Sequence, residues 1–335
     1  MKPKNVKDME FSLLLPHFGI HASKERLIDG SIKAEELGFD AVCVRDHLLF
    51  EPHGEMEAPN REFYDALITL TAIGAVTERI KLTTGSLIPF RHPLHLGLML
   101  GTMTHLVGDR LIVGMGAGTY DHEFEAIGMG HANRPKLTKS NAEILRLIAT
   151  GTDVSYKDEY YEFSNVTIEP RPVGGPIPYW YCGGTPASVR LAVEYCDGWW
   201  PGRINIPTMK ARLTYMEEQM ELQGRTEPVT IAVIPPTSVG KTREEALKHV
   251  NVEGLCKWAN KAKFWVKPES GSFETADDLE GSLIAGTVDE VVAECEKFAA
   301  IGTDHLVFDL RFRFDDYYEQ MELLGEVIAK IRAKS

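Results

Sequence analysis

The chain has 335 residues, of which 44% are hydrophobic and 25% are charged, a composition typical of a globular protein with a large core. Its formal net charge of −13 argues against a nucleic-acid partner, because proteins bind phosphate backbones through clustered lysine and arginine. The apolar run at residues 11–15 is far shorter than a signal-peptide core or a membrane span, so we expect a cytoplasmic protein with no membrane partner.

Strand and helix patterns alternate along the chain, as short β-forming runs are followed by segments with apolar residues at the helical period. In chain order, the patterns predict a strand at 11–15, a helix at 24–37, a strand at 41–44, a helix at 66–76, a strand at 80–86, a helix at 94–106, a strand at 110–118, a helix at 137–149, strands at 177–184 and 197–202 separated by a helix at 187–195, a strand at 229–236, a helix at 288–300 and a strand at 305–310. Eight strands in such βα units predict an α/β protein with the (β/α)8, or TIM-barrel, fold. We expect one such domain over residues 1–335.

Two segments are longer than the connections of a barrel usually are. A polar and aromatic segment at 152–175, after the fourth helix, is expected to form a small hairpin or a surface excursion. After the seventh strand, a region that includes 260–287 exceeds a single helix. Long segments that follow strands often lie at the catalytic face, so we expect either a lid over the substrate pocket or a helical insertion without catalytic contacts.

The pair Asp46-His47 ends the second predicted strand, where a barrel places its functional residues. An imidazole can donate or accept a proton near neutral pH, which makes His47 the best acid/base candidate. The adjacent carboxylate could hydrogen-bond a cofactor. An Asp-His pair is also common as a turn or helix cap, and its place at a strand end favours the catalytic interpretation.

Glycines follow two further strands. Gly114-x-Gly116-x-Gly118 lacks the full G-x-G-x-x-G frame of a dinucleotide site and follows the fourth strand rather than the first, but it would let a flat ligand approach the backbone. Gly183-Gly184-Thr185 directly precedes a helix and offers amides and a hydroxyl at its positive end, which is either a phosphate site or only a turn. The spacing of cysteine and histidine residues predicts no metal site.

Several segments together resemble one family. GFDAVCVRDH, ERIKLTTGSLIPFRHPLHLG, DRLIVGMGAGTYDHEFEAIGM, PIPYWYCGGTPASVRLAVEYCDGWW and AGTVDEVVAECEKFAAIGTDHLVF are similar, in their order and spacing, to the luciferase-like flavin-dependent oxidoreductases and monooxygenases. The resemblance extends over residues 11–310. It implies a TIM barrel that binds either the deazaflavin coenzyme F-420, for hydride transfer, or reduced FMN, with oxygen as cosubstrate and a separate flavin reductase as partner.

The resemblance also implies roles for individual residues. Asp46 matches a ring-contacting position and His47 an acid/base position, and in the deazaflavin enzymes a non-proline cis peptide, here Gly85-Ser86, backs the ring. The ring would rest on the third and fourth strands, with Gly183, Gly184 and Thr185 at the phosphate and Arg203 as a phosphate partner. From their places at strand ends and in the loops that follow, we further expect Gly116, Ala117 and Gly118 at the cofactor and His17, Phe18 and Phe50 in the substrate pocket.

Two positions depart from known members of the family. Gly116 and Ala117 stand where luciferase has a cysteine and an arginine, which argues against light emission. Thr119 stands where the deazaflavin sugar-phosphate dehydrogenases have a glutamate acid, which argues against that substrate, although His122 and Glu123 lie just beyond and could substitute.

Three functions follow from this interpretation. The first is an oxidoreductase that uses F-420 to transfer a hydride to or from a small organic substrate. The second is an FMN-dependent monooxygenase, and the third is a flavin-binding barrel without catalysis. Members of the family are commonly homodimers through barrel helices two and three, and the apolar segment 94–106 is compatible with such a dimer, although it would also serve the core of a monomer.

Overall fold

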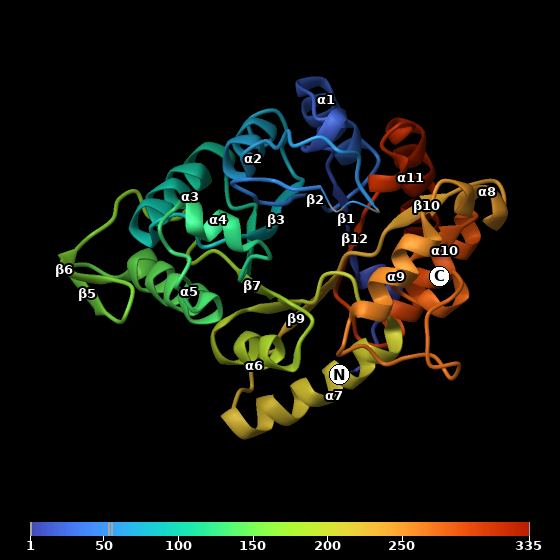
Figure 1. Cartoon of the computed structure of the whole chain (residues 1–335). Helices are drawn as coiled ribbons and strands as arrows, with labels where there is room; N and C mark the ends of the chain where they lie inside the picture. Colours follow the sequence, from blue (N-terminus) through green and yellow to red (C-terminus); the bar gives the residue numbers. More distant parts are fainter. Residues whose placement is uncertain (1, 53, 55, 335) are drawn as a thin grey trace.

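The computed structural model of the chain describes residues 2–52, 54 and 56–334. Eight parallel strands close into a barrel, which confirms the predicted fold (Figure 1). In order around the barrel, they are β1 (Glu10–Leu14), β2 (Ala41–Val44), β3 (Lys81–Leu87), β4 (Leu111–Gly116), β7 (Tyr179–Cys182), β8 (Gly198–Trp200), β9 (Thr230–Val233) and β12 (His305–Phe308). β12 pairs with β1 and closes the ring. Helices cover the outer face, so strands such as β2 and β12 are buried throughout.

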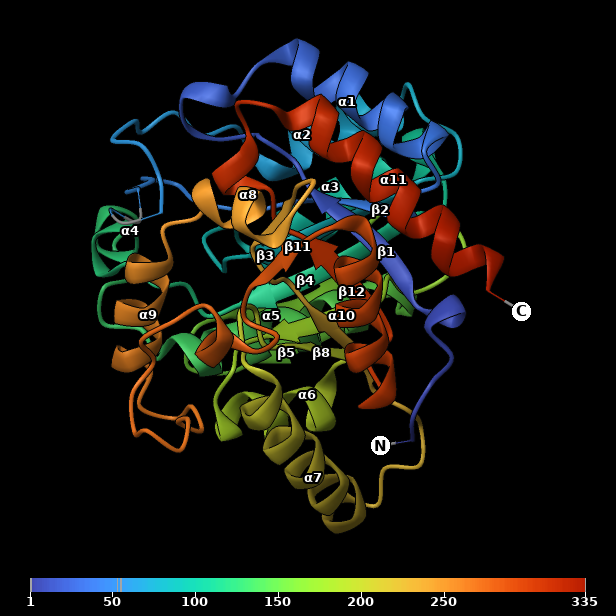
Figure 2. The ribbon, with the colours of Figure 1, turned by 90° about the vertical axis from the view of Figure 1, so that its right-hand side faces the viewer.

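The outer helices surround the barrel in Figure 2. They are α1 (Lys24–Glu36), α2 (Ala66–Gly74), α3 (Pro93–Val107), α4 (Asp121–Ala126), α5 (Arg134–Thr150), α6 (Pro186–Tyr195), α7 (Ile206–Gln223), α10 (Val288–Ala300) and α11 (Tyr317–Ala333). Short polar side chains cap most of their amino ends, as Ser23 does for α1 and Asn133 for α5. None of the helices in the described ranges is long and apolar enough to cross a lipid bilayer.

The sequence patterns did not predict α7 or α11. The buried face of α7 contains Thr208 and Gln219 beside methionines, so its apolar period is weak. The helix α11 follows the last predicted strand, as a (β/α)8 fold requires, and its buried Met321, Leu324, Ile328 and Ile331 recur near the helical period, so the sequence did contain a signal for it.

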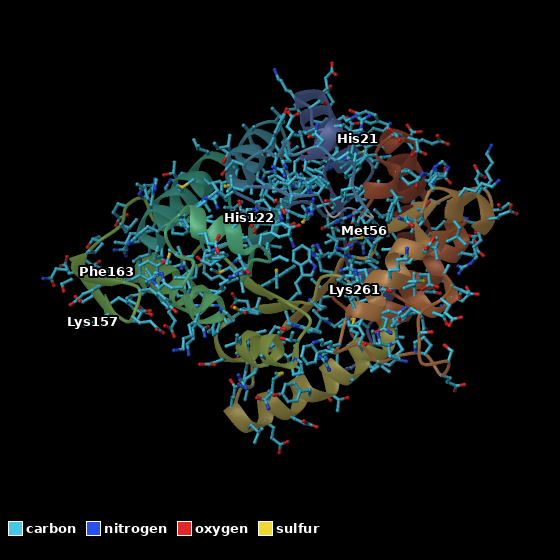
Figure 3. All side chains as sticks on the ribbon, in the orientation of Figure 1. His21, Met56, His122, Lys157, Phe163 and Lys261 are labelled. Carbon is cyan, nitrogen blue, oxygen red and sulfur yellow. The ribbon has the colours of Figure 1, made fainter. Side chains whose placement is uncertain are left out.

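Both long segments contain secondary structure. The first forms the predicted hairpin from the antiparallel strands β5 (Val154–Lys157) and β6 (Glu162–Val166). The second contains β10 (Thr237–Val239), α8 (Arg243–Lys248), α9 (Val252–Lys261) and β11 (Ile284–Gly286), and β10 and β11 form a small parallel sheet of their own. Its apolar residues, among them Leu255, Cys256 and Phe273, form a separate core cluster. In Figure 3, Lys157 and Phe163 mark the hairpin at one edge of the molecule, well away from Met56 and Lys261.

Candidate active site

A cavity of about 430 Å³ lies at the carboxyl ends of the barrel strands. Catalytic groups of this fold come from the strand ends and the loops that follow them. The predicted site residues in the cavity wall are Asp46, His47, Gly85, Ser86, Gly183, Gly184, Thr185 and Arg203. The segment after α9, with Phe264 and Trp265, completes the wall, so the second insertion contributes to the pocket.

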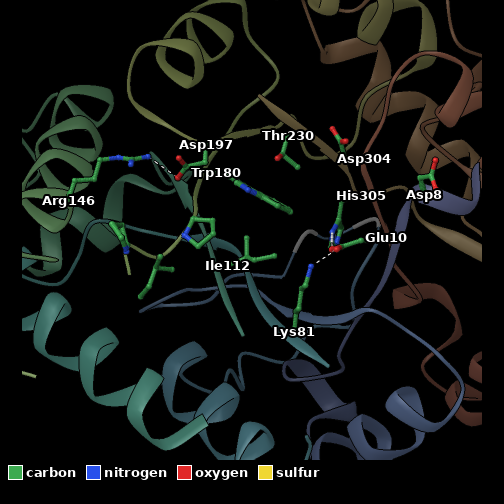
Figure 4. A pocket seen from close by; sticks show the side chains of 13 residues that line it. Asp8, Glu10, Lys81, Ile112, Arg146, Trp180, Asp197, Thr230, Asp304 and His305 are labelled. Atoms are coloured by element: carbon green, nitrogen blue, oxygen red, sulfur yellow. Dashed lines mark hydrogen bonds and ion pairs between the residues drawn. The ribbon is translucent and has the colours of Figure 1, made fainter. Parts of the chain in front are cut away.

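A second cavity, of about 530 Å³, lies at the opposite end of the barrel (Figure 4). Several of its charged groups are paired with each other. His305 Nδ1 lies 3.2 Å from Glu10 Oε2, the ammonium of Lys81 donates to the same glutamate, and Arg146 forms an ion pair of 2.8 Å with Asp197. Because catalytic groups of this fold come from the carboxyl ends of the strands, and these charges at the other end pair with one another, the carboxyl-end cavity is the better candidate for chemistry.

His47 is held by a buried carboxylate. Its Nδ1 lies 3.2 Å from Glu123 Oε1, and this oxygen also accepts the backbone N–H groups of Leu48 and Leu49, at 2.8 and 3.1 Å. Burial alone would raise the pKa of Glu123, but these hydrogen bonds and the neighbouring His47 hold it below its ordinary value. An ionised Glu123 can only accept a hydrogen bond, so a neutral His47 must carry its proton on Nδ1. This tautomer leaves Nε2 without a proton and available for proton transfer.

Asp46 is tied to the next βα unit. Its carboxylate receives two hydrogen bonds from Arg91, at 2.7 and 3.1 Å, and a third from the N–H of Ile88 at 3.1 Å. Arg91 also pairs with Asp65, the cap of α2. Asp46 therefore lies in the wall of the cavity while it connects the ends of β2 and β3.

The Gly85-Ser86 peptide bond is cis, as the family resemblance implies. A Cβ atom at Gly85 would lie 2.7 Å from the ring of Trp200, and one at Gly116 would lie 2.2 Å from Ser86 Oγ. A Cβ at Gly114 would come within 2.2 Å of the carbonyl oxygen of Thr84. We expected the glycines of the fourth strand to leave space for a flat ligand. Instead, Gly114 and Gly116 allow the neighbouring strand β3 to pack closely against β4. Neither these two nor Ala117 and Gly118 line the cavity.

The loop Gly183-Gly184-Thr185 leads into α6, and Thr185 caps the helix by accepting the N–H of Ser188 at 3.2 Å. The N–H of Gly183 donates to Trp200, whereas those of Gly184 and Thr185 meet no acceptor in the described part of the chain. Arg212, from α7, donates to the carbonyl of Gly184 at 3.2 Å. Two free amides, a helix amino end and a nearby guanidinium are suited to bind a phosphate.

Arg203 lines the same cavity, but the contacts of its side chain are with residues outside this loop. Its guanidinium stacks over Trp258, with 4.9 Å between the central carbon and the ring centre, and donates to Met56 Sδ. Arg212 therefore takes the place beside the candidate phosphate loop that we expected for Arg203. Sequence reasoning missed Arg212 because it lies in the unpredicted helix α7.

Three residues expected in the substrate pocket lie behind its wall instead. Phe18 and Phe50 enclose Arg45, whose guanidinium lies 3.9 Å from the centre of the Phe18 ring, and both line a side cavity of about 50 Å³. His17 is fully buried, and both of its ring nitrogens are used. Nδ1 donates to the carbonyl of Leu15, and Nε2 accepts the N–H of Arg45, both at 2.9 Å.

The burial of His17 predicts sensitivity to acid. Burial and the charge of Arg45 lower the pKa of His17 from 6.5 to about 3, so between these values the unfolded chain binds more protons than the folded one. The free energy of unfolding should therefore fall as the pH drops below 6.5. Urea unfolding at pH 7.5 and at pH 4.5 measures how much of this free energy is lost. The loss in His17→Gln should be smaller than the loss in the native protein by about 1–3 kcal/mol. An equal loss in both proteins would contradict this role.

Comparison with known proteins gives one family. Residues 9–305 match the family model described as luciferase-like monooxygenase. The F-420-dependent glucose-6-phosphate dehydrogenase of Amycolatopsis mediterranei is 26% identical over 309 residues, which cover 87% of this chain and 91% of that protein.

Solved structures share the fold. An F-420-dependent secondary alcohol dehydrogenase, in complex with an F-420–acetone adduct, superposes with a TM-score of 0.80 at 19% identity and covers 99% of this chain and 100% of its own. The oxygenating constituent of 3,6-diketocamphane monooxygenase from Pseudomonas putida, in complex with FMN, gives 0.74 at 18% identity over 96% and 98% of the two chains.

Proposed function

The chain belongs to the family of luciferase-like monooxygenases, and from this premise we propose that it is an oxidoreductase that uses coenzyme F-420 to transfer a hydride to or from a small organic substrate. The F-420-dependent relative that aligns over most of its length supports this choice of cofactor. The observation that carries the proposal is the arrangement around the cavity, whose wall contains His47, held by Glu123 from behind, together with the Gly85-Ser86 segment and the loop Gly183-Gly184-Thr185.

The residues of the cavity fit such a cofactor. Its volume of about 430 Å³ lies in the range of small-molecule sites. The buried indole N–H of Trp200, in its wall, has no hydrogen-bond partner in the described part of the chain and would donate to a bound ring. The free amides of Gly184 and Thr185, with Arg212, would hold the phosphate. The bound cofactor would supply the hydride, and the cavity would hold the substrate beside it.

The role of His47 in this proposal is to move one proton. Hydride transfer to a carbonyl leaves an alkoxide that must be protonated, and the reverse reaction needs a base for the alcohol proton. Nε2 of His47 is available for both, since Nδ1 is engaged by Glu123.

Cofactor titration tests the proposal. The purified protein is titrated with F-420, with FMN and with reduced FMN under anaerobic conditions, and cofactor and tryptophan fluorescence report binding. We expect F-420 to bind at least about tenfold more tightly than either form of FMN, a difference of about 1.4 kcal/mol. Binding of none of them would contradict the assignment of the site.

An FMN-dependent monooxygenase is the second candidate, favoured by the family description and by the fold shared with an FMN complex. Preference for reduced FMN in the same titration, with oxygen consumed in the presence of a flavin reductase, would favour it. A barrel that binds a cofactor without catalysis would show binding but no turnover.

We further propose that the chain forms a homodimer through α2 and α3. These helices expose Ile68 and Leu106, at 70% and 64%, beside a groove lined by Leu98 and Met99. Exposed apolar surface of this kind is typical of a protein interface. Sedimentation should give twice the chain mass of 37.4 kDa, and Ile68→Asp should give the monomer. A native protein that sediments as a monomer at micromolar concentration would contradict the dimer.

A further inference from the structure

Three arginines meet at one side of the candidate active site. Arg45 follows β2, Arg203 follows β8 and Arg311 follows β12, and all three line the cavity. Arg311 is paired on both sides, with Asp309 at 2.6 Å and with Glu57 at 2.8 Å. Among the described residues that meet here, three cations therefore face two carboxylates, which leaves one positive charge in excess.

Arg45 is only partly satisfied by its neighbours. It is 8% exposed, and its NH2 group lies 3.0 Å from Glu57 Oε1 without the alignment of a hydrogen bond. Its Nε also has no hydrogen-bond partner among the residues that the structure describes. Phe18, Phe50 and Phe63 cover the guanidinium with their rings. Burial lowers the pKa of Arg45 to about 10, so it stays charged at neutral pH with buried N–H groups that lack acceptors.

Arg203 has no carboxylate partner in the described ranges. It stacks on Trp258 and donates to the sulfur of Met56, which is a weak acceptor. Burial and the nearby charge of Arg311 lower its pKa to about 9, which still leaves the guanidinium protonated at neutral pH. A desolvated, unpaired cation of this kind is costly unless an anion is bound beside it.

We propose that the substrate of this enzyme carries a carboxylate, which binds to Arg45 and Arg203, and an apolar or planar remainder that faces Trp258 and Trp265. The inference rests on the proposed function, because it names the substrate class of the same cavity. A carboxylate carries a single negative charge, which matches the single excess charge of the cluster. A phosphate monoester would bring about −1.5 to −2 and suits the cluster less well. Lys263, also in the wall, is exposed, so its charge is screened by water and salt.

Benzoate and benzamide provide a test that needs neither cofactor nor turnover. They have nearly the same shape and differ in charge, and Trp200, Trp258 and Trp265 in the wall report binding by fluorescence. Benzoate should bind the native protein at least about tenfold more tightly than benzamide, since a charge-assisted pair contributes more than a neutral hydrogen bond. In Arg203→Gln the preference should fall to about threefold or less, and Arg203→Lys should restore part of it. Arg190→Gln, which removes an exposed arginine of α6, is the matched control and should keep the native preference.

A second pair of ligands distinguishes the two sources of an anion. If the cluster binds the cofactor phosphate instead, Arg203→Gln will weaken FMN at least about tenfold relative to riboflavin and leave benzoate unchanged, which overturns the inference. Equal binding of benzoate and benzamide to the native protein also overturns it. The proposed function fails separately, when no cofactor binds, because the benzoate measurement uses the protein alone.

Discussion

Replacing His47 by glutamine should lower turnover of any substrate found for the native protein by about 10²–10⁴-fold, the usual contribution of a general acid or base. Glutamine can still reach Glu123 but cannot exchange a proton near neutral pH. His47 lies in the wall rather than at the phosphate loop, so the cofactor dissociation constant should stay within about threefold of the native value. Steady-state kinetics and cofactor titration of the same preparation measure both. Native turnover in His47→Gln would contradict the role.

Glu123→Gln separates positioning from proton transfer. It leaves His47 in place but removes the charge that fixes its proton on Nδ1, so turnover should fall less, by about 10–100-fold. A long-range ¹H–¹⁵N spectrum gives a readout without substrate. In the native protein it should show the His47 proton on Nδ1, and in the variant a mixture of tautomers. Lys297→Gln, in an exposed ion pair with Glu294, is the control and should change neither.

The barrel could be predicted from the sequence because its signals are local. Each strand is a short buried run, and each predicted helix has an apolar period, as in β2 and α10. Where the signal is not local, the prediction was incomplete. The pairing of β10 with β11 joins segments separated by two helices, and the buried face of α7 is largely polar or methionine.

The candidate site was predictable only as single residues. Asp46, His47 and the loop Gly183-Gly184-Thr185 stand next to strand ends, which the pattern reveals. The sequence does not reveal which residues pair with one another. His47 and Glu123 are 76 residues apart, and Arg45 and Arg311 come from opposite ends of the chain. Charge pairing across a barrel depends on which strand ends converge, and this becomes visible only with the closed ring.

Asp46→Ala should be the most destabilising substitution in the site. It would leave Arg91 with Asp65 as its remaining carboxylate partner and the buried N–H of Ile88 without its acceptor. Removal of one partner from a largely buried ion pair costs about 3–5 kcal/mol. Urea unfolding measures this loss, and Asp46→Asn, which keeps an acceptor for Ile88, should lose less. Equal stability of Asp46→Ala and the native protein would contradict the role of this pair.

The double variant Asp46→Ala/Arg91→Ala shows what the pair does for the site. Removal of both charges leaves neither one buried and unpaired, so the double variant should be more stable than the sum of the single losses, with a coupling of about 1–3 kcal/mol. If Asp46 acts by holding Ile88 and the end of β3, cofactor affinity should fall with stability and recover in part in Asp46→Asn. Loss of cofactor binding in Asp46→Asn at native stability would instead mean that the carboxylate itself contacts the ring.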